Sequence, residues 1–281
     1  MAHLVPLVFV ALWSTGFIGS KAGLPYIEPL TFLVVRFAIA TPLFVAWSLA
    51  VKAPWPRGRQ ALHVAVVGAA LHGVYLGGVF VSISWGLPAG LSALIVGMQP
   101  LLTAAIIRAL GEDVTPRQWL GLGLGFVGVG AVLWEKLGFE GIPLVAVWPS
   151  VIGLFGITFG TLYQQRFCRN VNLATGGVIQ YAAATLVLVG PMFAFETRAI
   201  DWTPQLFGAL AWLILVLSMG AISLLMLLAR RGAAAQTASL FYLVPPTTAL
   251  MAWVLFGEVL GFLALAGMAL TAFGVYLVRK S

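Results

Sequence analysis

Ten long apolar segments follow one another along this chain, with only short polar intervals between them. A helix needs about 20 mostly apolar residues to cross the hydrocarbon of a bilayer. Only 8% of the residues are charged, against roughly 25% in an ordinary soluble domain. We therefore predict an all-α polytopic membrane protein without a soluble domain. The ten predicted transmembrane helices cover residues 4–22, 30–51, 61–84, 87–107, 117–134, 143–165, 173–195, 206–229, 233–256 and 259–278.

The basic residues indicate how this bundle is oriented. When the ten helices are threaded through a bilayer, eleven Lys and Arg residues fall on the side of the N-terminus and four on the other side. Cytoplasmic loops carry such an excess of basic residues. We expect a multi-pass protein of the bacterial plasma (inner) membrane, with both termini cytoplasmic. The net charge of +7 then faces anionic membrane lipids, and we expect no nucleic-acid partner.

A pattern in one half of the chain returns in the other half. The stretch PLLTAAIIRALGED at 100–113 and the stretch PTTALMAWVLFGEV at 246–259 each place a Gly-Glu pair eleven and twelve residues after a proline. At an offset of 144, LVVRFAIAT at 33–41 also matches GVIQYAAAT at 177–185. Chance similarity between Leu, Ala and Gly-rich helices is the alternative, but the matches keep their order and nearly one register.

The position of these matches fixes the topology of the predicted repeats. The first repeat covers residues 1–138 and the second covers residues 139–281, with five helices in each. Because five is an odd number, the two repeats have inverted topology. Transporters with inverted repeats work by alternating access and bind substrate near the midplane of the bilayer. A secondary transporter is therefore the leading interpretation.

Helical spacing gathers polar and aromatic residues into stripes on several predicted helices. Such side chains face the protein interior or a water-filled cavity, because lipid offers them no partner. The alternative for Ser and Thr is a hydrogen bond to their own helix or to a neighbouring helix. The predicted substrate-pathway residues are Trp13, Phe17, Ser20, Lys21, Arg36, His72, Tyr75, Ser82, Ser92, Gln99, Thr103, Thr158, Thr161, Gln165 and Tyr242.

Arg36 is a basic residue inside a predicted span, where a charge is costly unless it finds a partner. One interpretation pairs it with Glu28 or with the carbonyl groups that end the first helix. The other lets Arg36 or Lys21 attract a substrate carboxylate. Pro100, Pro245 and Pro246 lie within predicted spans, where proline kinks a helix, and we predict them as hinges.

Other classes of protein fit the sequence less well. All eight acidic residues lie at span ends or in loops, so an intramembrane lipid-modifying enzyme lacks a catalytic set. We predict no catalytic residue, metal site or cofactor. A structural or lipid-scrambling membrane protein stays open as an alternative.

The chain resembles the EamA branch of the drug/metabolite transporter superfamily. The resemblance lies in ten predicted helices, Trp13 in the first, Arg36 in the second, and the twofold Pro and Gly-Glu pattern. His72 and the aromatic-rich helices are most similar to bacterial exporters of aromatic amino acids. The resemblance implies export of small metabolites through a cavity lined mainly by helices 1, 3, 4, 6, 8 and 9, with helices 5 and 10 peripheral.

The predicted stripes are aromatic and amide-rich and nearly uncharged, which favours a neutral, amphipathic substrate. Aromatic or other neutral amino acids fit this description, and a multidrug or other metabolite exporter of the same fold is the alternative. Since one chain contains both repeats, a monomer would suffice.

Overall fold

The computed structural model describes residues 5–87, 89–134, 143–231, 238–256 and 261–280. Within these ranges the protein is a bundle of helices, and the only β pairing is an isolated antiparallel bridge between Ile27 and Ile200. The helical elements are α1 (Val5–Gly23), η1 (Leu24–Tyr26), α2 (Pro29–Ala50), α3 (Arg59–Gly68), η2 (Ala69–Val74), α4 (Tyr75–Ser84), α5 (Ala89–Val96), α6 (Gln99–Ala109), α7 (Pro116–Leu133), η4 (Leu144–Ala146), α8 (Val147–Phe167), α9 (Leu173–Phe195), α10 (Pro204–Trp212), η5 (Leu213–Ala221), α11 (Ile222–Arg231), η6 (Leu240–Leu243), α13 (Val244–Phe256) and α14 (Phe262–Arg279).

The hydropathy of these helices is that of a membrane protein. In the described residues, six helical stretches are long and apolar enough to cross a bilayer. They are Pro29–Ala50, Arg59–Ser84, Ser92–Ala109, Leu144–Phe167, Leu173–Phe195 and Pro204–Leu228. Two shorter apolar helices cover Val5–Gly16 and Phe262–Val278. The predicted all-α membrane architecture is confirmed at this level.

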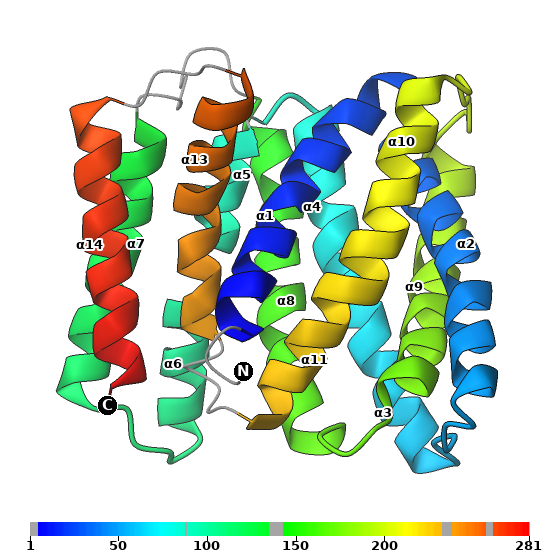
Figure 1. Ribbon diagram of the computed structural model, residues 1–281, viewed down its shortest axis with the longest axis horizontal. Helices are drawn as coiled ribbons and strands as arrows, with labels where there is room; N and C mark the ends of the chain where they lie inside the picture. Colours follow the sequence, from blue (N-terminus) through cyan, green and yellow to red (C-terminus); the bar gives the residue numbers. More distant parts are fainter. Residues whose placement is uncertain (1–4, 88, 135–142, 232–237, 257–260, 281) are drawn as a thin grey trace.

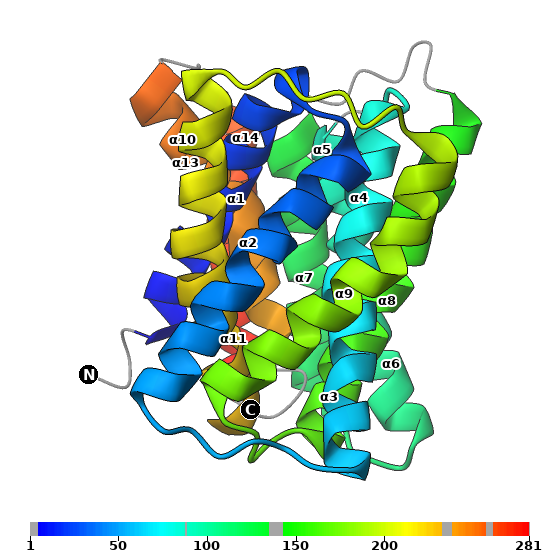
Figure 2. The same ribbon diagram turned by 90° about the vertical axis from the view of Figure 1, so that its right-hand side faces the viewer.

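Two pairs of helices form opposite edges of the bundle. Figure 1 shows α7 beside α14 at one edge and α2 beside α9 at the other, with α1, α4, α5 and α13 between them. In Figure 2 the α2/α9 pair faces the viewer and the α7/α14 pair lies behind. Helix α1 begins and α14 ends at the lower end of the bundle in both views. We call this end the terminus end.

The α7/α14 pair packs through glycine. A methyl group added at Gly121 would lie 2.6 Å from the carbonyl oxygen of Gly274, and one added at Gly267 would lie 2.6 Å from that of Gly128. Such spacing leaves no room for side chains and lets the two backbones approach closely. The contacts are reciprocal, because Gly267 and Gly274 follow Gly121 and Gly128 by the same 146 residues.

The fourth predicted span is not one continuous helix. Residues 97 and 98 form a turn between α5 and α6, so the prediction of a single helix over 87–107 is wrong at this point. The ninth span changes from the 3₁₀ helix η6 to α13 at residues 243 and 244, which lie 146 residues later. Pro100 and Pro245 therefore stand in the first turn of α6 and α13. Proline is tolerated there because the first N–H groups of a helix have no intrahelical acceptor.

Two π-helical segments interrupt the third and eighth spans. They are η2 and η5, and they begin 144 residues apart. The hydropathy pattern gave no sign of them. A π segment frees backbone carbonyls and often marks a functional site.

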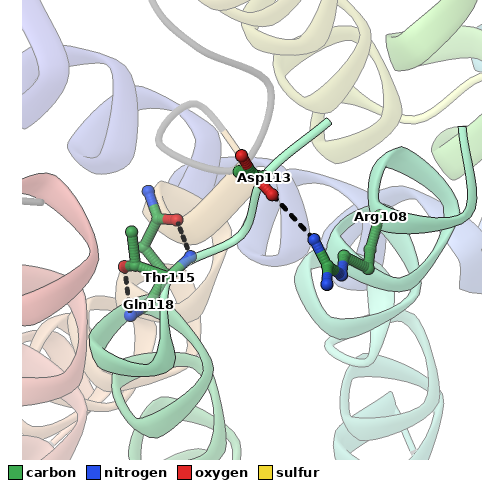
Figure 3. A network of polar contacts seen from close by, with 4 residues as sticks. All are labelled: Arg108, Asp113, Thr115 and Gln118. Atoms are coloured by element: carbon green, nitrogen blue, oxygen red, sulfur yellow. Dashed lines mark hydrogen bonds and ion pairs between the residues drawn. The ribbon is translucent and has the colours of Figure 1, made fainter. Parts of the chain in front are cut away.

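The Gly-Glu motif of the first half ends α6 at the terminus end. Gly111 has a φ of +89°, which turns the chain away from the helix in a conformation that favours glycine. Figure 3 shows how the connection to α7 is fixed: Arg108 forms an ion pair with Asp113 at 2.8 Å, and Thr115 and Gln118 form a capping box. The second Gly-Glu pair, at 257–258, lies outside the described residues.

Candidate functional site

A cavity lies where the interruptions of the fourth and ninth spans meet α1 and α4. The cavity and the open space at its mouth together hold about 440 Å³ without protein atoms. No charged residue belongs to its described lining. The lining residues are Trp13, Tyr75, Val79, Ser92, Ala93, Val96, Gly97, Gln99, Phe241, Val244 and Pro245.

Aromatic rings form one wall of this cavity. The rings of Trp13 and Phe241 meet edge to face, with centroids 5.2 Å apart and an angle of 90° between their planes. Phe9 packs against both rings from behind, at 5.2 Å from Trp13 and 5.5 Å from Phe241. Edge-to-face pairs hold aromatic side chains in fixed orientations. The wall is therefore a packed apolar surface on which a flat substrate group could stack.

Gln99 supplies the polar part of the lining. Its side chain is fully buried, and neither amide atom has a hydrogen-bond partner among the described residues. Ser92 of α5 is another predicted polar residue of the lining. Its hydroxyl is already hydrogen-bonded to the Ser150 hydroxyl of α8 at 2.7 Å. Gln99 therefore holds a donor and an acceptor that this conformation leaves unused.

The structure brings four of the predicted pathway residues to the cavity, namely Trp13, Tyr75, Ser92 and Gln99. The predicted hinge Pro245 also lines it. Phe241 was missed, because no stripe or spacing distinguished it within the apolar ninth span. Its neighbour Tyr242, which was predicted, packs against Gly125 of α7 instead.

The described lining differs from the expectation raised by the family resemblance. Its residues come from the first, third, fourth and ninth spans. The sixth span, which contains α8, and the eighth span contribute no residue to the described lining. The remaining buried pathway residues outside the lining are Arg36, His72, Ser82, Thr103, Thr158, Thr161, Gln165 and Tyr242. Ser20 is half-buried and also lies outside the lining, and the side chains of Phe17 and Lys21 lie outside the described part of the chain.

Arg36 and His72 belong to a second polar cluster, between α2, α9, η2 and η5. Arg36 Nε donates to Ser218 Oγ at 3.1 Å, and His72 Nε2 lies 3.3 Å from Gln180 Oε1. These two bonds correspond to each other, because Gln180 follows Arg36 by 144 residues and Ser218 follows His72 by 146. The offset of 146 added to His72 gives Ser218, whereas the offset of 144 gives Val216, so the repeat alone narrows the corresponding residue to these two.

Of the partners that the sequence offers for Arg36, Glu28 is wrong. The Glu28 carboxylate accepts hydrogen bonds from the backbone N–H groups of Thr197, Arg198 and Ala199 at 3.2, 2.6 and 3.3 Å. Arg36 is 5% exposed, and no described carboxylate forms an ion pair with it. The Phe37 ring lies 5.7 Å from its guanidinium carbon. The charge is thus held by hydroxyl and aromatic groups.

Two glutamates fasten α2 to the segment after α9 at the end opposite the termini. Glu196 accepts from the N–H groups of Leu30 and Thr31 and from the Thr31 hydroxyl, each at 2.7 Å. A carboxylate at this position also complements the helix dipole of α2. Partial desolvation of Glu28 raises its pKa, but the hydrogen bonds from Thr197, Arg198 and Ala199 outweigh it and lower the pKa below its ordinary value of 4.5.

Comparison with known proteins identifies the family of this chain. The family model for EamA-like transporters matches residues 1–134 and again residues 145–280. The chain belongs to the EamA-like transporter family. The family is one of transporters, so we conclude that the protein is a multi-pass transporter of the inner membrane and not an enzyme.

Several curated relatives of the family are similar over nearly the whole chain. The "Uncharacterized inner membrane transporter YedA" of Escherichia coli K12 is 29% identical over 95% of this chain and 87% of its own length. The "Probable amino-acid metabolite efflux pump" of Salmonella typhimurium is 24% identical over 96% of this chain and 92% of its own. The "Probable terminal-alkyne amino-acid exporter" of Streptantibioticus cattleyicolor is 25% identical over 96% and 91%.

A solved crystal structure has the same fold. It superposes with a TM-score of 0.81 at 18% sequence identity, over 99% of this chain and 96% of the other chain. At this identity the likeness concerns the fold alone. No group of three or more His, Cys, Asp or Glu side chains in the described ranges is placed to hold a metal ion.

Proposed function

We propose that this EamA-family protein is a secondary transporter that exports small neutral amphipathic metabolites, with aromatic and other neutral amino acids as substrates. Two relatives whose names refer to amino-acid efflux or export support the substrate class. The observation that carries the proposal is the cavity, which joins a packed aromatic wall to the unpaired amide of Gln99 without a charged residue in its described lining. An aromatic ring would stack on one of the two perpendicular rings, Trp13 or Phe241, and meet the other edge to face, and the polar end of the substrate would bond Gln99.

Alternating access by two inverted repeats, residues 1–138 and 139–281, is the proposed mechanism. Two sets of reciprocal contacts support it: the glycine contacts between α7 and α14, and the corresponding bonds Arg36–Ser218 and His72–Gln180. A contact between two equivalent units must be reciprocal in this way. The proposed hinges Pro100, Pro245 and Pro246 stand in or near the first turns of α6 and α13, beside the two helix interruptions.

The terminus end is proposed to face the cytoplasm, as the excess of Lys and Arg on that side of the threaded chain favours. In this orientation Glu28 and Glu196 face the periplasm. One chain holds both proposed repeats, so we propose that a monomer transports.

Counterflow uptake into liposomes containing the purified protein tests the proposal. Labelled Phe, Trp and a panel of other amino acids should enter saturably. Gln99→Met nearly keeps the volume of the side chain and removes its hydrogen bonds. It should raise the half-saturation concentration about 10-fold or more, as expected for the loss of a hydrogen bond to the charged amino or carboxylate group of the amino acid. Trp13→Ala should do likewise through lost stacking.

The matched control for Trp13 is Trp253→Ala on α13, since Trp253 is 52% exposed on the outside of the bundle. This variant should transport like the parent protein. Absence of saturable uptake for every amino acid would overturn the proposed substrate class.

A further inference from the structure

Unpaired polar atoms gather on two neighbouring helices, α6 and α8. In the described chain, eight buried side-chain atoms have no hydrogen-bond partner. Four of them belong to these two helices: both amide atoms of Gln99, Oγ1 of Thr103 and Nε2 of Gln165. The other four are scattered singly, on Ser82, Tyr181, Ser223 and Tyr242.

The two helices that carry these groups are in contact, and we call the line along which they meet the seam. Ser92 of α5 meets Ser150 of α8, 58 residues apart, and α6 continues the path of α5 beside α8 (Figure 1). Both helices begin nearer the end of the bundle opposite the termini and run toward the terminus end (Figure 1). Beyond the turn at residues 97 and 98, Thr103 lies in the second turn of α6, and Gln165 lies in the last turn of α8. The seam therefore runs from the Gln99 end of the cavity to the terminus end of the bundle.

Thr103 extends the polar face of Gln99 one turn deeper. Residues four apart share a helix face, and Thr103 lies about 6 Å beyond Gln99 at 1.5 Å per residue. Its hydroxyl does not bond its own helix, whereas those of Thr158 and Thr161 donate to the carbonyl four residues earlier at 2.7 and 2.6 Å. The usual structural role of a buried threonine in a membrane helix thus accounts for Thr158 and Thr161 but not for Thr103.

A buried polar group without a partner costs about 1–3 kcal/mol, and such groups need an explanation. An alternating-access protein supplies one, because a group that is dry and unpaired in one conformation meets water or substrate in the other. The cavity stops at Gln99 here, since none of the deeper seam residues belongs to its lining.

Resting on the proposed transport function, we propose that the seam between α6 and α8 is the closed terminus-side half of the substrate pathway. Gln99, Thr103 and Gln165 line it, and they bind water and the hydrogen-bonding end of the solute when it opens. Charged side chains are absent from the described seam until Arg108 and Arg166 at its end, so the seam fits a solute without net charge.

Cysteine accessibility tests this assignment directly, because the chain has a single cysteine. Cys168 is buried, and burial raises the pKa of its thiol to about 11, so it reacts slowly even in the parent protein. Cys168→Ala removes this thiol altogether, and any labelling then comes from the introduced cysteine. Thr103→Cys and Gln165→Cys are then treated with a membrane-impermeant cationic thiol reagent from each side, in intact cells and in inverted vesicles. The matched control is Ala105→Cys, on the exposed face of the same helix.

We expect both seam cysteines to react from the terminus side only, at least about tenfold faster than Ala105→Cys, because lipid excludes a charged reagent. A saturating transported solute should change the rate at Thr103→Cys. Rates no faster than that of the control, or reaction from the opposite side only, would overturn the assignment.

Thr103→Val gives an independent readout in the purified protein. Replacing an unpaired hydroxyl by a methyl group of the same shape should raise the melting temperature and lower the counterflow rate. A lower melting temperature would instead indicate a structural hydrogen bond and contradict the proposal. Because thiol labelling needs no knowledge of the solute, one-sided labelling without amino-acid uptake would refute the substrate class and leave the seam assignment standing.

Discussion

The two helix pairs at opposite edges of the bundle are joined by different chemistry. The α7/α14 pair uses backbone contact at glycines. The α2/α9 pair uses aromatic side chains in the middle, where the Phe37 and Tyr181 rings lie 5.0 Å apart, and polar groups at its ends. Packed backbones have one arrangement, whereas hydrogen bonds can exchange partners. We therefore expect the α7/α14 pair to hold the halves together and the α2/α9 pair to respond to transport and to pH.

The ends of the α2/α9 pair differ as well. Thr31 donates to the Glu196 carboxylate, and Thr175, which follows it by 144 residues, donates to the carbonyl oxygen of Pro54 at 2.9 Å. A charged acceptor makes a stronger hydrogen bond than a neutral one. The attachment at the end opposite the termini is thus the stronger of the two.

The largest effect is expected for Gly128→Leu. A methyl group at Gly128 would already lie 2.7 Å from the Gly267 carbonyl oxygen, so a larger side chain forces the two backbones apart. We expect a loss of more than about 3 kcal/mol of stability, the upper range of overpacking, measured as a lower melting temperature in detergent. Gly123→Leu on the same helix is the control, because nothing lies within 4 Å of its added methyl group. Equal melting temperatures for both variants would contradict the role of the glycine contact.

An intermediate effect is expected for Glu196→Ala. The change leaves the first N–H groups of α2 and the Thr31 hydroxyl without their acceptor. The loss of a helix cap costs about 0.5–2 kcal/mol, so the melting temperature should fall by less than in Gly128→Leu. Glu112→Ala provides the comparison, since the Glu112 side chain is exposed and makes no described hydrogen bond. Equal melting temperatures for Glu196→Ala and Glu112→Ala would show that the Glu196 attachment contributes nothing to stability.

The smallest effect is expected for acid pH acting on Glu28. Because hydrogen bonds hold its folded pKa below the ordinary 4.5, ionised Glu28 stabilises the fold above that value. This contribution is lost as the pH falls through the lowered pKa. The melting temperature should therefore drop more between pH 6 and pH 3 for the parent protein than for Glu28→Gln, with the difference arising below about pH 5. Parallel curves for the two proteins would refute this assignment.

Much of the architecture and part of the candidate site were predictable from the sequence. Apolar length identifies membrane helices without knowledge of their neighbours, and six of the ten predicted spans correspond to long apolar helical stretches in the described residues. Trp13, Tyr75, Ser92 and Gln99 were found because polar and aromatic residues in such helices face inward. Phe241 and Ser218 were missed, since one is an aromatic residue within an apolar run and the other a serine whose partner is far away in the sequence.

Arg36 illustrates where reasoning from the sequence stops. The sequence requires a buried partner for its charge and offers Glu28, the acid just before its helix. In the structure Glu28 binds the segment after α9, and Arg36 reaches Ser218 on η5. Choosing between such partners requires the packing of helices more than 160 residues apart, which hydropathy does not encode.

The sequence by itself determined the class of the protein and six of its membrane segments, and it predicts an internal repetition, because these depend on composition and periodicity along the chain. Only the tertiary structure decided which polar side chains share a cavity, where helices are interrupted and which atoms are left without partners. Those properties depend on distances between segments that are remote in the sequence. Gln99 shows both kinds of information. The sequence gives its polar amide within an apolar span, and only the packed bundle shows that this amide has no hydrogen-bond partner.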